Sequence, residues 1–292
     1  MTKLIQLLII GIATGSIFGL IALGFTLVYK ATKVFNFAQG DLMTLGAYML
    51  VSFSATSLGL PAYVAIPLAI GSGIPLGLLF QFIFARPLIG QPFLPVVMAT
   101  IAAALIIQAV IQINWGIVDQ PYDSQFPQEV YNISGVRISS FDLITIGVAA
   151  TCVALFALFF RLTTVGLQMR AAAAHNEAAV LSGINIHRVS LLAWGIGTLL
   201  AFVAGIILAN GQGAVTFSLT GLGLLAFPAV VIGGLESIGG AVVGGVIVGI
   251  LQALIGGYYD PLAQDSLVYA ALLLMLLVRP YGLFGQREIQ RV

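Results

Sequence analysis

The side chains of this chain that could do acid–base, nucleophilic or metal chemistry are few. Among 292 residues there are two His and one Cys. His175 and His187 are 12 positions apart with only Glu177 nearby, which is not the His-Glu-x-x-His spacing of a zinc protease. The sequence also lacks the Gly-x-Ser-x-Gly elbow of hydrolases and the Gly-x-x-x-x-Gly-Lys-Ser/Thr phosphate loop. We therefore expect no catalytic site and no metal site, and histidines that are simply solvated.

Amide side chains inside apolar runs form a second group. Gln108 and Gln112 are four residues apart, which places both on one face of a helix, and Asn114 follows them. A polar group facing lipid is costly, so we expect these amides to face other helices or a watery cavity. Two interpretations stay open, namely hydrogen bonds between helices and the lining of a translocation pathway.

A polar segment before the apolar run at Leu42 predicts a break between two helices. It contains Asn36, Gln39, Gly40 and Asp41. Asp41 is placed to cap the following helix by accepting a backbone N–H from its first turn. The alternative is a role for this segment in the pathway or its gate.

A second break is predicted where paired glycines flank an acidic residue. Gly233 and Gly234 precede Glu236, and two more glycines follow it. We expect Glu236 to lie near the start of the next helix, where the helix dipole favours a negative charge. These glycines and Glu236 are also candidates for a gate.

The remaining sequence indicates that a membrane surrounds these residues. Hydrophobic residues make up 60% of the chain and charged residues 7%, with a mean hydropathy of +1.11. Such a composition exceeds what a soluble core needs. Uncharged runs such as 4–29 are longer than the roughly 20 residues that cross a bilayer as a helix. Since lipid cannot bond to backbone groups and no barrel-like alternation occurs, the fold class is predicted as all-α.

The chain divides into apolar segments that predict a single membrane-embedded bundle over residues 1–292, with about eight or nine crossings. The segments 222–235 and 262–281 could instead be re-entrant or tilted. The loops leave no room for an ATP-binding domain, so energy must come from an ion gradient or another polypeptide. The expected spans are 4–29, 42–58, 61–84, 93–113, 141–160, 189–209, 222–235, 237–257 and 262–281.

Glycines four residues apart predict where helices pack closely. They occur at 11, 15 and 19, at 240 and 244, and at 245 and 249. Such ridges let helix backbones approach each other in lipid. A sliding interface that moves during transport is the alternative interpretation.

Charged residues predict the orientation of the bundle. Most Lys and Arg residues fall on one side of the nine segments, which the positive-inside rule assigns to the cytoplasm. The charged stretch 161–188 is then cytoplasmic and the acidic loop 115–140 is external. The near-neutral net charge of +1 gives no sign of nucleic-acid binding.

The cytoplasmic stretch predicts one short amphipathic helix from Leu167 to Ser182. Its many alanines favour a helix, and an apolar stripe gives it one docking face. Gly183 can adopt the left-handed conformation that ends a helix. From these residues alone, binding to a partner and lying on the membrane surface are equally good interpretations.

This stretch resembles the EAA-type loop of bacterial ABC importer permeases. The resemblance rests on Glu177-Ala178-Ala179 followed by Gly183, within a longer run from Met169 to Asn185. Other blocks resemble the branched-chain amino-acid permease family (LivH-like) in order and spacing. They are Tyr29 to Tyr48 around Asn36-Phe37-Ala38-Gln39-Gly40-Asp41, Gly233 to Gly245, and Arg279-Pro280 to Gly285. The family often has Pro where Gly239 stands, so that loop is a mild variant.

The resemblance implies a permease subunit in a bacterial inner membrane. Its partners would be a second homologous permease, two cytoplasmic ATP-binding subunits and a periplasmic or extracellular substrate-binding protein. ATP and Mg would be bound by the partner subunits, and this chain would hold no cofactor. The segment 168–185 would be the coupling helix. The coupling residues that the resemblance implies are Arg170, Glu177, Ala178, Ala179, Gly183, Asn185 and Arg188.

The substrates implied are leucine, isoleucine and valine, with urea or short amides as the alternative within ABC importers. A secondary transporter or channel that works without ATPases, and a membrane scaffold, are the alternatives outside that class. The middle of the predicted spans lacks ionisable side chains, which weakens the secondary-transporter interpretation.

Overall fold

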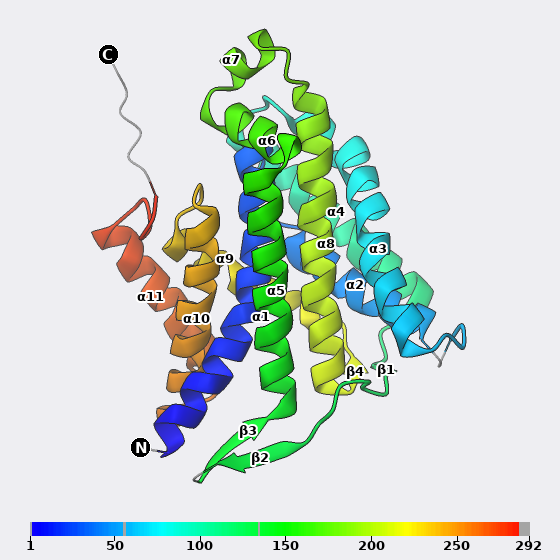
Figure 1. Cartoon of the computed structure of the whole chain (residues 1–292), viewed down its shortest axis with the longest axis vertical. Coiled ribbons are helices and arrows are strands. Elements are labelled where there is room, and N and C mark those ends of the chain that lie inside the picture. Colours follow the sequence, from blue (N-terminus) through cyan, green and yellow to red (C-terminus); the bar gives the residue numbers. More distant parts are fainter. Residues whose placement is uncertain (1, 55–56, 134, 286–292) are drawn as a thin grey trace.

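A computed structural model describes residues 2–54, 57–133 and 135–285, and helices dominate it (Figure 1). The long helices lie side by side in one elongated bundle, as the all-α prediction requires. A π turn, Gln81–Ala85, and a 3-10 turn, Arg86–Leu88, extend α3. The helices are α1 Thr2–Thr32, α2 Gln39–Phe53, α3 Ala62–Phe80, α4 Phe93–Trp115, α5 Ser140–Leu162, α6 Thr164–Ala174, α7 Asn176–Leu181, α8 Ile186–Gln212, α9 Leu219–Gly233, α10 Ile238–Tyr258 and α11 Gln264–Val278.

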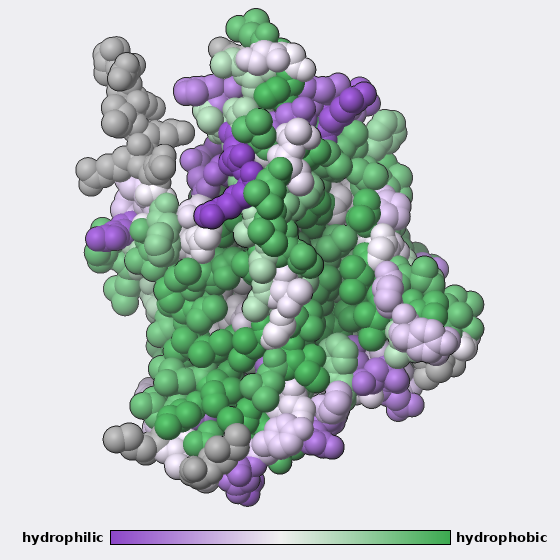
Figure 2. Space-filling view, viewed as in Figure 1, coloured by the Kyte–Doolittle hydropathy of each residue, from purple (hydrophilic) through white to green (hydrophobic). Residues whose placement is uncertain are grey.

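Within the described residues, six helices are long and apolar enough to cross a membrane. They are α1, α3 with its extension, α4, α5, α8 and α10. Figure 2 shows the corresponding hydrophobic band, with hydrophilic residues gathered toward both ends of the molecule. The polytopic helical membrane protein expected from composition is therefore confirmed.

Three further helices, α2, α9 and α11, contain 15 residues each. At about 1.5 Å per residue each is about 22 Å long, which is less than the roughly 30 Å of hydrocarbon in a bilayer. The crossing expected over 42–58 is thus replaced by a shorter helix that starts three residues earlier and ends at Phe53.

Four short strands lie at one end of the bundle, which we call the strand end. They are β1 Gln120–Pro121, β2 Val130–Ile133, β3 Val136–Ser139 and β4 Ala214–Val215. The strands β2 and β3 form an antiparallel hairpin, and β1 pairs antiparallel with β4. These strands were not predicted from the sequence, because elements of two to four residues show no readable alternation.

The opposite end, which we call the basic end, carries Lys30, Lys33 and Arg170 around one cavity and includes α6 and α7 (Figure 1). Its helices correct the prediction of one continuous helix from 167 to 182. The backbone of His175 is extended, with φ −150° and ψ 100°, and separates α6 from α7. His and Asn are weaker helix formers than Ala, so the chain breaks at this pair within the alanine-rich stretch.

The glycine ridges bring α1 and α10 into backbone contact. A Cβ added to Gly245 would lie 2.5 Å from the Cα of Gly19, and one added to Gly249 would lie 2.3 Å from the Cα of Gly15. Distances this short leave no room for any side chain. The tight-packing interpretation of these glycines is confirmed.

Candidate translocation pathway and coupling segment

The predicted break before α2 is present, and buried amide groups organise it. Asn36 accepts a hydrogen bond from the Ala38 backbone N–H at 3.2 Å and donates one to Gln39 Oε1 at 2.9 Å. Gln39 in turn donates to the carbonyl of Gly197 in α8 at 3.0 Å. All of these groups are buried, so the amides satisfy each other and a neighbouring helix where water is excluded.

Asp41 does not cap α2, which corrects the capping prediction. The helix already begins at Gln39, and Ala38 occupies the N-cap position. Asn36 makes the local polar contacts instead, because its side chain reaches the Ala38 N–H two residues later. The Asp41 side chain is only 3% exposed, and its Oδ1 accepts a hydrogen bond from Gln108 Nε2 of α4 at 2.8 Å. Asp41 is thus an ionisable group inside the bundle, whereas the prediction left it at the edge of a span and placed no such group in the middle of one.

The start of α9 crosses the start of α2 beside Asp41. A Cβ added to Gly223 would lie 2.1 Å from the Cα of Gly40, so the two helices touch through their backbones. Next to this crossing, Thr220 Oγ1 donates to Thr44 Oγ1 at 3.3 Å. Two short helices therefore begin at one polar point inside the bundle.

The two short helices leave this point in opposite directions. At the end of α2, Ser52 accepts a hydrogen bond from the Trp115 indole at 2.8 Å, at the end of α4 that leads to the strands. α9 ends at Gly233, close to the lysines of the basic end. Neither helix crosses the bundle by itself, and together they cover its two halves.

The other two amides predicted to line a pathway do not join this cluster. Gln112 and Asn114 are both exposed on α4, and Asn114 donates to the carbonyl of Val110 on its own helix at 2.7 Å. Gln108 is half-buried and turned toward Asp41. Of the three amides that the sequence grouped together, only Gln108 contacts the polar cluster.

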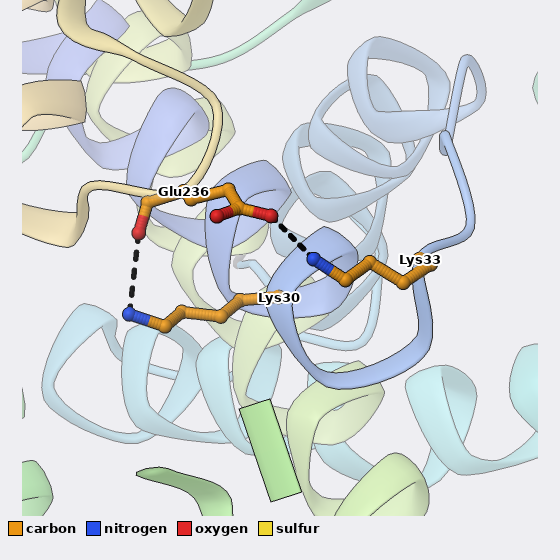
Figure 3. Close-up of polar contacts among 3 residues, drawn as sticks. All are labelled: Lys30, Lys33 and Glu236. Atoms are coloured by element: carbon orange, nitrogen blue, oxygen red, sulfur yellow. Dashed lines mark hydrogen bonds and ion pairs between the residues drawn. The ribbon is translucent and has the colours of Figure 1, made fainter. Parts of the chain in front are cut away.

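The second predicted break lies between α9 and α10 and is held to the end of α1 (Figure 3). Gly234 has φ 102°, a conformation that favours glycine. Glu236 precedes Ser237, which caps α10 by accepting the Gly240 N–H at 3.0 Å. The Glu236 carboxylate thus lies just outside the helix start and pairs with Lys33.

A second lysine contacts the same residue. Lys30 Nζ donates to the Glu236 carbonyl oxygen at 3.2 Å, so Glu236 is bound by Lys30 in the last turn of α1 and by Lys33 just after it (Figure 3). The paired side chains of Lys33 and Glu236 are 55% and 43% exposed. An ion pair this exposed orders the loop and adds little stability.

A cavity of about 1050 Å³ separates this break from the α6–α7 segment. Lys30, Lys33 and Glu236 line one side, and Arg170 and His175 line the other. Of its charged lining residues three are cationic, Lys30, Lys33 and Arg170, and one is anionic. The cavity therefore leaves unfilled space between the α6–α7 segment and the ends of α1 and α9.

The residues implied in coupling shape the α6–α7 segment in different ways. Arg170 anchors α6 to α5 by donating to the carbonyl of Phe160 and lying 5.5 Å from that ring's centroid. Ala179 is buried at 3% exposure. Gly183 has φ 81°, which confirms the predicted left-handed turn after the helix.

Of the other implied residues, Asn185 caps α8, and its Oδ1 accepts the Arg188 N–H at 3.2 Å. Ala178 and Arg188 are exposed. Glu177 belongs to α7, and its side chain lies outside the described part of the structure.

The apolar stripe predicted for docking includes Leu181 but not Val180, and both residues belong to α7. Leu181 is 89% exposed and Val180 is 54% exposed, at the tip of the basic end. The sequence does carry a signal for Val180, since it stands next to Leu181 outside any predicted span. One continuous helix would place Leu181 on the stripe and Val180 off it, whereas the short α7 exposes both.

These features define a multi-pass helical membrane protein with discontinuous helices meeting in its interior and an exposed helical segment at one end. Residues 7–277 match the family described as the branched-chain amino acid transport system permease component. The chain belongs to this family, which confirms the resemblance noted in the sequence. It is a family of transporter permease components and not of enzymes.

Relatives align with this chain over most of its length. The high-affinity branched-chain amino acid transport system permease protein LivH of Escherichia coli is 30% identical, covering 97% of this chain and 96% of its own. The corresponding protein BraD of Pseudomonas aeruginosa is 28% identical, covering 99% and 98%. A probable LivH of Methanocaldococcus jannaschii is 31% identical, covering 91% and 88%.

Proposed function

We propose that this chain is the permease subunit of an ABC importer that moves leucine, isoleucine, valine or related amino acids across the bacterial inner membrane. ATP hydrolysis on partner subunits drives the transport. The observation that carries the proposal is the family match over residues 7–277, together with relatives of stated role that align over nearly their whole length.

The partners of the proposed assembly are a second homologous permease, two ATP-binding subunits that hold ATP and Mg, and an external substrate-binding protein. The basic end then faces the cytoplasm, since Lys and Arg are retained on that side. The strand end, with its acidic residues in the loop 116–139, faces the binding protein.

The α6–α7 segment is the proposed coupling element between the ATPases and the membrane helices. Two exposed apolar side chains, Val180 and Leu181, project from the basic end and suit a groove on a partner protein. Arg170 links α6 to α5, while Asn185 starts α8 directly after the segment. Movement of the segment would therefore be transmitted to two crossing helices.

A reconstituted assembly tests this function. The chain is purified with its permease, ATPase and binding-protein partners and placed in proteoliposomes. Uptake of radiolabelled leucine should require ATP and the binding protein, and should survive an ionophore that collapses ion gradients. Uptake by this chain alone under an ion gradient would identify a secondary transporter instead.

The substitution Glu177→Lys tests the coupling role of the α6–α7 segment. The charge reversal should lower ATP-driven uptake while membrane insertion stays intact. Unchanged uptake and unchanged ATPase association would show that the segment does not couple. Competition by isoleucine, valine, urea and acetamide, measured on the cognate binding protein, then identifies the substrate class.

A further inference from the structure

We infer that the carboxylate of Asp41 contacts the ammonium group of the amino acid as it passes through the bundle. The inference rests on the proposed function, because only an amino-acid substrate brings such a group. It concerns a residue of the α2–α9 crossing and is independent of the coupling segment.

The first observation is how deep Asp41 lies in the bundle. Asp41 bonds to Gln108, which lies seven residues before the end of α4 at Trp115 and fifteen after its start at Phe93. These separations correspond to about 10 Å and about 22 Å along the helix. With 3% exposure, Asp41 is therefore a carboxyl group buried well inside the membrane-spanning part.

The second observation is the missing counter-charge. Among the side chains that the structure describes, one ion pair forms, Lys33 with Glu236, so Asp41 has no described cationic partner. Its side-chain donor from α4 is the neutral amide of Gln108. A buried carboxylate without a cation is strongly disfavoured, and its retention within a membrane indicates a functional role.

The third observation is the position of Asp41 at the crossing of α2 and α9. Asp41 lies where α2 and α9 begin, at the Gly40–Gly223 backbone contact, with the hydroxyl groups of Thr44 and Thr220 beside it. Secondary transporters commonly place their substrate sites where discontinuous helices meet near the middle of the membrane, and the α2–α9 crossing has the same form. The crossing gives this carboxyl group neighbours that are polar and uncharged.

The substrate ammonium group can replace the Gln108 amide as the hydrogen-bond donor to Asp41. An ammonium group offers three N–H donors and a full positive charge, whereas the Gln108 amide offers neutral donors. The ammonium group can take the place of the Gln108 amide on the carboxylate and form a charge-assisted hydrogen bond, which is stronger. The substrate itself thus supplies the counter-charge for the duration of its passage.

Asp41→Asn tests the charge without changing the shape. The asparagine side chain keeps an oxygen that can accept from Gln108, so packing and the hydrogen bond persist. We expect leucine uptake by the reconstituted assembly to fall at least tenfold, with the amount of leucine moved per ATP hydrolysed falling in parallel. Assembly with the ATPases should be unchanged.

A matched control is available in the same chain. Gln252 donates to Asp265 Oδ1 at 2.8 Å, which reproduces the bond between Gln108 and Asp41 at an exposed aspartate of α11. Asp265→Asn should leave uptake unchanged. Equal losses in both variants would overturn the inference, as would full activity of Asp41→Asn.

A measurement on the wild-type assembly covers the case in which Asp41→Asn does not fold. A hydrophobic carbodiimide labels buried carboxyl groups, and peptide mass spectrometry quantifies the label at Asp41. Leucine present during turnover should lower labelling of Asp41 several-fold and leave Asp265 unaffected. Undiminished labelling of Asp41 would refute the contact. A wild-type assembly that transports no amino acid would refute the proposed function itself.

Discussion

Gly249 of α10 lies directly against Gly15 of α1, so that a Cβ on Gly249 would lie 2.2 Å from the Gly15 backbone nitrogen. We predict that Gly249→Ala destabilises the protein by about 1–3 kcal/mol, because a methyl group must push the two helices apart. Thermal unfolding in detergent measures the loss.

Gly147 of α5 is the matched control, because no atom lies within 4 Å of a Cβ built there. Gly147→Ala should leave stability unchanged or raise it by about 0.5–1 kcal/mol, since Ala is the better helix former. Equal destabilisation by both substitutions would show that the α1–α10 contact is not the tight one.

Leu181 tests the coupling segment. Replacing this 89% exposed side chain with Asp removes an apolar contact without disturbing the core, so the free chain should be as stable as the wild type. We expect a fall of at least tenfold in affinity for the ATPase subunits, measured by co-purification and by light scattering of the purified assembly.

Leu262, between α10 and α11, is 90% exposed and provides the control at the opposite end. Leu262→Asp should leave ATPase association intact. If both variants retained the ATPases equally, α7 would not be part of their binding surface.

Gly183 ends the coupling segment with φ 81° in open space, so only backbone conformation opposes a side chain there. We predict that Gly183→Val lowers ATP-driven uptake several-fold, because a β-branched residue disfavours this conformation strongly. Gly183→Asn should be much milder, since Asn tolerates the left-handed region. Similar uptake by both variants would contradict a conformational role.

Lys33 combines an exposed ion pair with an unfavourable backbone, since its φ is 56°. Both Lys33→Gly and Lys33→Ala remove the pair with Glu236, but only glycine relieves the conformation. We predict that the glycine variant is more stable than the alanine variant by about 1 kcal/mol. Thermal unfolding of the two variants side by side provides the measurement, and the reverse order would show that the left-handed turn is not present.

Several elements could be predicted from the sequence because they follow from local chemistry. Long apolar runs must be helices in lipid, and paired glycines around Glu236 predict a break wherever the chain runs. The glycine spacing in α1 and α10 likewise predicts close packing before any partner helix is known. The resemblance at Glu177-Ala178-Ala179 pointed to the family, which the match over residues 7–277 confirms.

Other features depended on the tertiary structure. Asp41 and Gln108 are 67 residues apart, and Lys33 and Glu236 are 203 apart, so their contacts arise from how helices pack and turn. Periodicity shows which residues share a helix face but not which helix that face meets. For that reason the sequence suggested a cap for Asp41, and only the packing of α2 against α4 and α9 placed a lone carboxyl group inside the membrane-spanning bundle.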